Sequence, residues 1–296
     1  MVTVIGAGAI GGYLAAMLTE AGHKVTVCVR TRFDALTIEG SNGRRSIPVE
    51  VVTDPNSVDK AQWILLATKV QDTYSAKPWL DRLVGPSSTV LIAQNGIEQV
   101  ERTRLLAESA TIIPSIIYIS AERLKPGYIL HHGASHMIVP AGENGAAVQA
   151  LFAGSELEIV ESRNFLTASW RKLLANIAAN ALTALTMRRM DVFTEQPIVA
   201  LARCLLSEAV DVGQAEGAQL CARDVDDVLS MYANASPEGG SSMLYDRLSG
   251  RSLEHEHLTG ALLRAAEKHG IEVPLNQAIF ALLDAIDRAP RHAHGE

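Results

Sequence analysis

Short apolar runs alternate with amphipathic stretches through the first half of the chain. Residues 2–5 form a largely apolar, β-branched run that predicts a buried strand, and residues 10–21 predict a helix that stops at Gly22. Further strands are predicted at residues 24–29, 63–67, 89–93 and 111–119, with helices at 72–84 and 98–107. Strands that alternate with helices indicate βαβ units and a parallel sheet.

The pattern changes near residue 164. A hairpin is predicted at residues 127–132 and 137–140, and beyond residue 164 apolar residues recur at helical spacing. A loop is predicted at residues 236–242, followed by another helix. We therefore expect an α/β protein of two domains, with a parallel sheet in residues 1–162 and an all-helical domain in residues 163–296.

The glycine-rich turn between the first strand and the first helix carries specific chemistry. Gly6, Gly8 and Gly11 form a G-x-G-x-x-G pattern, with Ala9 and Ile10 before its last glycine. The first glycine permits a tight turn, the second lets the backbone approach a pyrophosphate, and the third allows the helix to pack closely on the strand. Because the pattern follows a strand and opens a helix, it predicts dinucleotide binding in a Rossmann-type domain rather than an ordinary turn.

The residues after the second strand bear on which dinucleotide binds. NAD enzymes usually have an acidic residue about 20 positions beyond the glycines, where it binds the ribose 2′-hydroxyl. This chain has Arg30, Thr31 and Arg32 there instead. A guanidinium matches a phosphate in charge and geometry, so Arg30, supported by Arg32 or Thr31, is expected to bind the 2′-phosphate of NADPH. The alternative is a surface arginine pair.

Composition and charge argue against several other classes of protein. The net charge of −7 lacks the basic excess of a nucleic-acid binder, and no apolar stretch reaches the ~18 residues of a membrane span. Cys28, Cys204 and Cys221 have no metal-binding spacing and suit a reducing compartment. No signal peptide is visible after Met1, so we expect a cytoplasmic protein with no metal site and no nucleic-acid or membrane partner.

Three polar residues stand four positions apart in an otherwise apolar helical stretch. Lys172, Asn176 and Asn180 fall on one face, because a step of four residues drifts only ~40° around a helix. A lysine and two amides on one stripe are unusual for a core helix and indicate a binding surface. The alternative is a partly exposed stripe at the domain boundary.

The stretch from Trp170 to Leu185, which holds this stripe, matches the pattern W-x-K-L-x-x-N-x-x-x-N-x-L-T-A. Six further motifs accompany this pattern. They are GAGAIGG at the glycine turn, Thr68-Lys69, Gln94-Asn95-Gly96, Ser241-Ser242-Met243-Leu244 with Asp246, Glu254, and the run Gly270-Ile271 to Pro274-Leu275-Asn276. Together they make nearly the whole chain similar to the ketopantoate reductase (2-dehydropantoate 2-reductase) family. The resemblance implies an NADPH-dependent enzyme of pantothenate biosynthesis that reduces the 2-oxo acid 2-dehydropantoate to pantoate, and it leaves a homodimer open.

The resemblance also implies a role for each matching residue of the second domain. Lys172 matches the catalytic lysine that donates the proton, and Glu254 matches the glutamate on the hydroxyl side of the substrate. Asn176, Asn180 and Ser242 match positions that bind the substrate. From the residues alone, Ser242 could equally be a helix N-cap, and Glu254 could lie on a solvated helix face.

Two residues of the first domain match cofactor positions. Asn95 matches an asparagine near the nicotinamide ribose and the reacting centre, and Lys69 matches a lysine that contacts the cofactor. The alternatives are a plain turn at Asn95-Gly96 and an exposed charge at a strand end for Lys69.

The chain departs from the family pattern in two places on the expected substrate side. Glu256 and Thr259 stand where the family has aspartate and asparagine, and residues 186–193 (TMRRMDVF) lack the glycine of the family's turn. These departures bear on the identity of the substrate more than on the reaction. The alternatives are therefore a reductase or dehydrogenase for another small 2-oxo or 3-hydroxy acid, and an NADPH-binding protein without turnover.

Overall fold

The structure is a computed structural model that describes residues 1–41 and 43–289. The chain divides into two compact units, the first from Met1 to Phe165 and the second from Leu166 onward. The division falls after Phe165, whereas the sequence pattern placed it after residue 162. Each unit is described by itself below.

Parallel strands form the central sheet of the first unit. In spatial order, the six strands of this sheet in the described residues are β5 (Glu50–Val52), β2 (Val25–Cys28), β1 (Val2–Ile5), β6 (Trp63–Leu66), β7 (Thr89–Ile92) and β8 (Thr111–Pro114). All neighbours are parallel. This confirms the predicted parallel sheet and the Rossmann-type strand order. Because β1 lies between β2 and β6, the carboxyl ends of these three strands mark the switch point where such sheets bind ligands.

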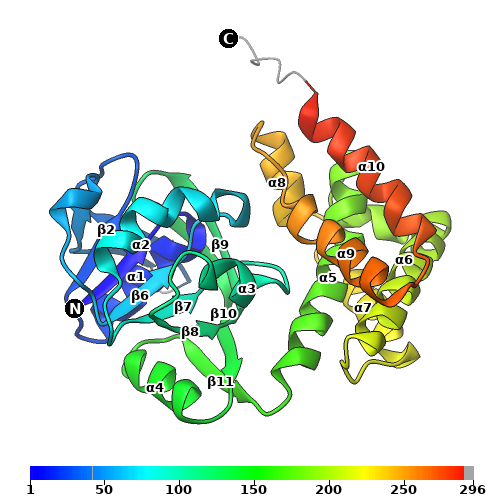
Figure 1. The fold of residues 1–296 in the computed structure, drawn as a ribbon. Helices are drawn as coiled ribbons and strands as arrows, with labels where there is room; N and C mark the ends of the chain where they lie inside the picture. Colours follow the sequence, from blue (N-terminus) through cyan, green and yellow to red (C-terminus); the bar gives the residue numbers. More distant parts are fainter. Residues whose placement is uncertain (42, 290–296) are drawn as a thin grey trace. The chain divides into compact units, whose positions relative to one another are not determined.

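Different elements cover the two faces of this sheet (Figure 1). Successive strand residues point to opposite faces, so Val4 packs in a core with Leu14 of α1 (Ala9–Glu20), and Ile5 packs with Leu80 of α2 (Lys77–Leu83). The core around α1 also contains Ile129 and Met137 of a second sheet. Helix α1 is therefore buried between two sheets, which fixes the glycine turn at its start.

The second sheet differs from the sequence-based prediction. It consists of β11 (Glu158–Ser162), β10 (Tyr128–Pro140), β3 (Leu36–Gly40) and β4 (Gly43–Ile47), with β9 (Ile116–Lys125) also paired to β10. The strand predicted at residues 111–119 is wrong, because β8 ends at Pro114 and β9 starts a new sheet after Ser115. The hairpin predicted within residues 127–140 is also wrong. Its two parts form one strand, β10, and the hairpin turns at Gly127, whose φ is +75°.

The remaining helices of the first unit are short. They are the 3-10 helices η1 (Pro55–Ser57) and η2 (Val70–Ala76), and the α-helices α3 (Gln99–Arg104) and α4 (Glu143–Leu151). The helix predicted at residues 72–84 is thus a 3-10 turn followed by α2. The Pro78 ring at the start of α2 suits a first helical turn, where its missing N–H needs no partner.

The second unit is helical throughout its described residues, as predicted. Its elements are α5 (Phe165–Thr186), η3 (Met190–Thr194), α6 (Gln196–Ala215), α7 (Ala222–Ala233), α8 (Ser242–Leu248), η4 (His255–His257), α9 (Thr259–His269) and α10 (Pro274–Arg288). No helix in the part of the chain that the structure describes is long and apolar enough to span a bilayer.

Helix α5 is held in this unit by close contacts along its length. A Cβ at Gly213 of α6 would lie 2.9 Å from the ring of Trp170, so the glycine lets the buried tryptophan lie against the α6 backbone. Arg171 donates to Asp224 of α7 at 2.7 Å. The Thr167 hydroxyl accepts from the N–H of Gln219 at 2.8 Å. These contacts fix the rotation of α5 and hence the direction of its polar stripe.

Candidate active site

The first strand ends in a turn that requires glycine. Gly6 has a φ of +96°, and its N–H donates to the carbonyl oxygen of Cys28 at 2.9 Å. A Cβ at Gly11 would lie 1.9 Å from the Gly6 carbonyl oxygen, which no side chain tolerates. A Cβ at Gly8 would meet no protein atom within 4 Å. The three glycines thus have the properties that a pyrophosphate-binding turn needs: a tight turn, open space at the second glycine, and close packing at the third.

Helix α1 presents its N-terminus at this turn. Among the described residues no side chain caps it, and its first turn has no acidic residue. The backbone N–H groups of the first turn, including those of Ala9 and Ile10, belong to the group that has no partner within a helix. Together with the positive end of the helix dipole, they fit the phosphates of a dinucleotide.

Arg30 and Asp72 lie on the two sides of β1. Arg30 follows β2, Asp72 belongs to η2 after β6, and Nη2 of Arg30 donates to Oδ2 of Asp72 at 3.3 Å. The side chains are 84% and 39% exposed. Exposed ion pairs contribute only about 0–1 kcal/mol, so the guanidinium can turn toward a phosphate at little cost. Lys69 is the half-buried N-cap residue of η2 in the same loop.

The loop after β7 is tied to the loop after β6 by a buried glutamine. The side-chain amide nitrogen of Gln94 lies 3.0 Å from both the carbonyl and the hydroxyl oxygen of Thr68. Asn95 follows, half-buried, and Gly96 turns the chain with a φ of +98°. Asn95 therefore stands in a turn, as its alternative interpretation held, and this turn lies at the carboxyl edge of the sheet.

Gln99 of α3 fixes the same turn and was missed from the sequence. Its amide nitrogen donates to the carbonyl oxygens of Gln94 at 2.6 Å and Gly96 at 2.9 Å. A glutamine in a polar helical segment ordinarily predicts an exposed side chain, so no signal marked this one. Its buried side chain therefore fixes the backbone on both sides of Asn95.

In the second unit, α5 carries the polar stripe as predicted. Lys172 and Asn176 are half-buried, and Asn180 is 4% exposed. Desolvation by the surrounding protein lowers the pKa of the Lys172 ammonium to about 8. A lysine with such a pKa is charged at neutral pH and gives up its proton more readily than an exposed lysine.

Asn180 and Ser242 are brought together by the packing of α8 against α5. The Ser242 hydroxyl donates to Oδ1 of Asn180 at 3.4 Å. The amide nitrogen of Asn180 is buried and has no hydrogen-bond partner among the described residues. A buried donor without a partner is costly, so it is a candidate contact for a substrate oxygen. The N-cap of α8 is Ser241, which accepts from the N–H of Leu244 at 3.1 Å, so the alternative reading of Ser242 as the N-cap is wrong.

Glu254 lies in a buried segment between α8 and α9. Its side chain is 3% exposed, so the alternative of a solvated helix face is wrong for this residue. The contacts beside it come from α10. The N–H of Leu253 donates to Oδ1 of Asp287 at 3.0 Å, and the buried ring of His255 lies 5.3 Å from the ring of Phe280. The position of Glu254 therefore depends on α10.

Both departures from the family pattern have a local explanation. Glu256 pairs with Arg264 of α9 at 2.5 Å, and Thr259 is buried as the first residue of α9. In the segment without glycine, Met187 adopts a φ of +57° and is the one non-glycine residue with positive φ in the described chain. The turn after α5 is therefore made by a methionine in a glycine-like conformation, as no sequence pattern indicated.

Two matched motif residues are structural. Asn276 of α10 is fully buried, and its side-chain nitrogen donates to Oε2 of Glu208 in α6 at 2.7 Å. The same carboxylate accepts from the N–H groups of Leu275 and Asn276 at 3.0 Å and so caps α10. Asp246 is buried in α8 and pairs with Arg251 at 2.9 Å.

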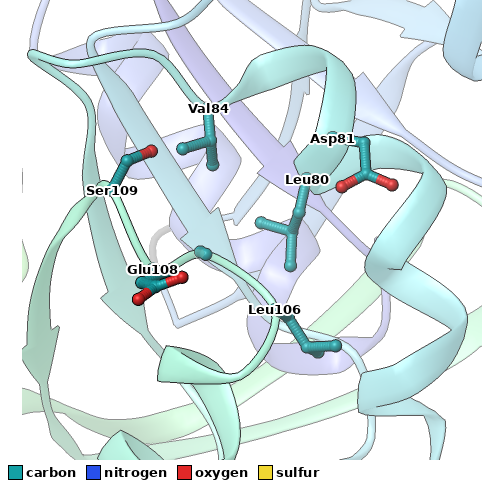
Figure 2. A pocket seen from close by; sticks show the side chains of 7 residues that line it. Leu80, Asp81, Val84, Leu106, Glu108 and Ser109 are labelled. Carbon is teal, nitrogen blue, oxygen red and sulfur yellow. The ribbon is translucent and has the colours of Figure 1, made fainter.

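A surface hollow of about 370 Å³ lies elsewhere in the first unit (Figure 2). Its lining includes Leu80 and Asp81 of α2 and Leu106 and Glu108 before β8. These segments lead into the amino ends of β7 and β8, opposite the carboxyl edge that holds the glycine turn. Within the first unit, the hollow is therefore separate from the glycine turn and the loops at Arg30, Lys69 and Asn95.

Comparisons with known proteins agree with this arrangement. Residues 2–144 match the family model "Ketopantoate reductase PanE/ApbA", and residues 164–287 match the model of its C-terminal part. The chain belongs to the ketopantoate reductase family. It is thus a member of a family of oxidoreductases that use a nicotinamide cofactor.

Relatives within the ketopantoate reductase family match nearly end to end. The chain is 38% identical to a 2-dehydropantoate 2-reductase of Caulobacter vibrioides over 285 residues, which cover 96% of this chain and 98% of the relative. It is 32% identical to the enzyme of that name from Mycobacterium tuberculosis, with 98% of each chain covered.

Solved structures show the same fold. A PanE/ApbA family ketopantoate reductase from Ralstonia eutropha JMP134 is 31% identical, with a TM-score of 0.89, and the match covers 99% of this chain and 100% of that one. A ketopantoate reductase from Staphylococcus aureus, described as dimeric, is 26% identical with the same TM-score, and covers 97% of this chain and 98% of that one.

Proposed function

We propose that this chain catalyses the NADPH-dependent reduction of 2-dehydropantoate to pantoate. The observation that carries the proposal is the stripe on α5, where a half-buried lysine with a pKa of about 8 precedes a buried amide nitrogen that has no hydrogen-bond partner in the described part of the chain. A proton donor and an unsatisfied donor on one helix face suit a substrate that has both a carbonyl and a carboxylate oxygen.

The first unit supplies the cofactor contacts in this proposal. Gly6, Gly8, Ala9, Ile10 and Gly11 would hold the pyrophosphate at the start of α1. Arg30 would bind the 2′-phosphate, which selects NADPH over NADH, while Lys69 and Asn95 contact the cofactor from the next loops. When bound, NADPH supplies the hydride that adds to the C2 carbonyl carbon of the oxo acid.

The second unit supplies the proton and the substrate contacts. As the C2 carbonyl oxygen gains negative charge, the Lys172 ammonium donates a hydrogen bond and then its proton to that oxygen, which yields the hydroxyl of the product. Lys172 is left as a neutral amine and regains a proton from solvent. Asn176, Asn180 and Ser242 orient the carboxylate, and Glu254 accepts a hydrogen bond from the substrate hydroxyl.

The test is NADPH oxidation with a panel of 2-oxo acids and, in the reverse direction, NADP+ reduction with 3-hydroxy acids. Ketopantoate is expected to have the highest kcat/KM, and NADPH is expected to be preferred to NADH. If another oxo acid were turned over a thousandfold more efficiently, the substrate assignment would be wrong and the reaction class would stand. If NADPH bound but no acid were reduced, the chain would be a cofactor-binding protein without turnover.

We also propose a cytoplasmic homodimer. The Staphylococcus aureus relative is described as dimeric. Cys28, Cys204 and Cys221 form no disulfide in the structure, in keeping with a reducing compartment. Light scattering coupled to size-exclusion chromatography should give twice the chain mass of 31.8 kDa; a monomer at micromolar concentration would contradict the dimer.

A further inference from the structure

A tyrosine hydroxyl from α7 joins the backbone of α5 in the middle of the polar stripe. The Ala179 N–H donates to Oη of Tyr232 at 3.2 Å. The hydroxyl in turn lies 3.0 Å from the carbonyl oxygen of Ala175 and 3.4 Å from that of Leu174. In a regular α-helix, Ala179 would donate directly to Ala175. The tyrosine therefore bridges the donor and the acceptor of one helical rung.

The bridged rung lies where the stripe needs precise geometry. Ala175 and Ala179 each precede a stripe residue, Asn176 and Asn180. A group that inserts into the hydrogen-bond ladder of a helix opens or bends the helix at that point. The spacing and direction of the two amides, relative to each other and to Lys172, therefore depend on the hydroxyl of Tyr232.

The tyrosine ring is itself held by the segment that departs from the family pattern. The rings of Tyr232 and Phe193 have centroids 4.5 Å apart, and both side chains are buried. Phe193 belongs to η3, whose first residue, Met190, donates its N–H to the carbonyl oxygen of Gly239 at 2.9 Å. Gly239 lies in the loop before α8, which carries Ser242. The segment of residues 186–193 thus packs on Tyr232, which bonds to the backbone of α5 next to Asn180. The same segment also bonds to the loop that leads to Ser242.

We propose that Tyr232 is a positioning residue for Asn176 and Asn180, and that Phe193 holds it in place. The inference rests on the proposed function, because it gives the two amides their role in binding the oxo acid. The Tyr232 hydroxyl fixes the backbone of α5 at Ala175 and Ala179, and this backbone sets the separation of the substrate-binding amides. Because Phe193 packs on Tyr232, the 186–193 segment affects substrate binding without touching the substrate.

The test compares Tyr232→Phe with the wild-type protein. The substitution removes one oxygen atom and keeps the buried ring. We expect the KM for ketopantoate to rise at least tenfold and kcat/KM to fall about 10- to 100-fold, since a displacement of about 1 Å can cost 10²-fold. The NADPH dissociation constant should stay within twofold. Phe193→Leu keeps the hydroxyl but loosens its support, so it should change KM in the same direction by a smaller factor.

Tyr13→Phe is the matched control. Tyr13 is fully buried in the first unit, and its hydroxyl lies 2.7 Å from that of Ser135, so this variant also loses one buried hydroxyl contact. It should lower the melting temperature without changing the KM for ketopantoate. If Tyr232→Phe behaved like Tyr13→Phe, with kcat/KM within threefold of wild type, Tyr232 would be only a structural residue.

The wild-type assay separates this inference from the proposed function. Failure of the wild-type protein to reduce ketopantoate would refute the proposed function. With wild-type turnover in hand, an unchanged KM in both Tyr232→Phe and Phe193→Leu would refute the positioning role alone. Hydrogen exchange adds a direct readout, because loss of the bridge should change the exchange rate of the amides near Ala179.

Discussion

In the proposed mechanism, the lysine on α5 is the residue on which the chemistry depends most. Its pKa of about 8 results from desolvation, and the four-residue spacing of α5 places it on the same face as the amides of Asn176 and Asn180. An exposed lysine, with a pKa of about 10.4, would be a weaker general acid at neutral pH. The sequence showed which face carries Lys172, but burial, and therefore acidity, depends on neighbouring helices and could not be predicted.

Lys172→Ala should lower kcat by about 10²-fold or more, the usual contribution of a general acid. NADPH binding should be retained, because the residues proposed to bind the cofactor lie in the first unit. In the wild-type protein the ammonium is the active form for reduction, so kcat should be level below pH ~8 and fall as pH rises through the pKa.

Lys172→Arg is the control for charge. A guanidinium keeps the positive charge but does not release its proton in this range, so kcat should stay low and lose the fall near pH 8. A Lys172→Ala enzyme within threefold of the wild-type kcat, with chemistry rate-limiting, would assign the proton to another donor.

The ion pair of Arg30 with Asp72 leads to a prediction about the affinity for the 2′-phosphate of the cofactor. If Arg30 binds the 2′-phosphate, the Asp72 carboxylate repels the same phosphate, and two such charges ~6 Å apart in water interact by roughly 0.7 kcal/mol per unit charge. Asp72→Asn should therefore tighten binding of 2′,5′-ADP severalfold and leave 5′-AMP unchanged. Arg30→Ala should weaken only 2′,5′-ADP. Calorimetric titration of both nucleotides measures the two effects.

Salt and a matched variant control this result. The gain from Asp72→Asn should shrink at 1 M salt, where the Debye length is ~3 Å. Asp81→Asn removes the same charge from α2, where Asp81 pairs with Lys77, and should change neither nucleotide. Weaker binding of 2′,5′-ADP by Asp72→Asn would show that Asp72 holds Arg30 in place instead.

At the scale of elements, the turn after α5 stores a small amount of strain. Met187 has a φ of +57°, a left-handed conformation that costs free energy for a residue other than glycine. Its side chain is half exposed, so burial of the side chain offsets little of this cost. Met187→Gly should raise the free energy of unfolding by about 1 kcal/mol, or a few degrees in melting temperature.

A glycine at a similar backbone angle provides the reverse experiment. Gly217 has a φ of +90° and room for a Cβ, so Gly217→Ala should destabilise by a similar amount. Thermal unfolding of the two variants measures both signs. A Met187→Gly protein less stable than wild type would mean that the methionine side chain contributes more than the turn costs.

Elements marked by a local apolar run could be predicted, and elements that depend on a distant hydrogen-bonding partner could not. The four central strands of the parallel sheet, β2, β1, β6 and β7, are almost wholly buried and therefore read as short apolar runs, with β1 predicted at its observed bounds. β10 runs through the polar stretch His131–His136 because β9 pairs with it on one side, and no local pattern reveals a distant partner. Residues 111–119 read as one strand because the apolar run continues across Pro114.

The same limit applies to the site. Regular spacing revealed Lys172 and the two asparagines, since four-residue steps are set by the helix itself. Tyr232 acts on the backbone of α5, 53 residues away, so its importance depends on packing between segments far apart in sequence. Gln99 bonds to the loop just before its own helix, but no spacing pattern shows that its side chain turns back to that loop. The resemblance to a family identified Glu254, but only the structure showed that α10 holds its segment.

At the scale of the whole molecule, the proposed roles divide between the two units. Hydrogen exchange should show this division: NADPH alone should protect the glycine turn and the loops at Arg30, Lys69 and Asn95. Addition of pantoate should extend protection to α5 around Asn176 and Asn180. Ligand binding should also raise the melting temperature with concentration, as mass action requires. Protection by NADPH centred on α10 would contradict the assignment.

The structural roles of Glu208 and Asn276 change what the motif around Asn276 can tell about function. The half-buried Glu208 carboxylate caps the start of α10, and the Asn276 side-chain nitrogen donates to this carboxylate and to the carbonyl oxygen of Leu205. An evolving enzyme could change its substrate and still need this pair to fold. The final motif is thus a marker of ancestry and architecture, and a search that weights it heavily will gather proteins of common descent whose chemistry has diverged.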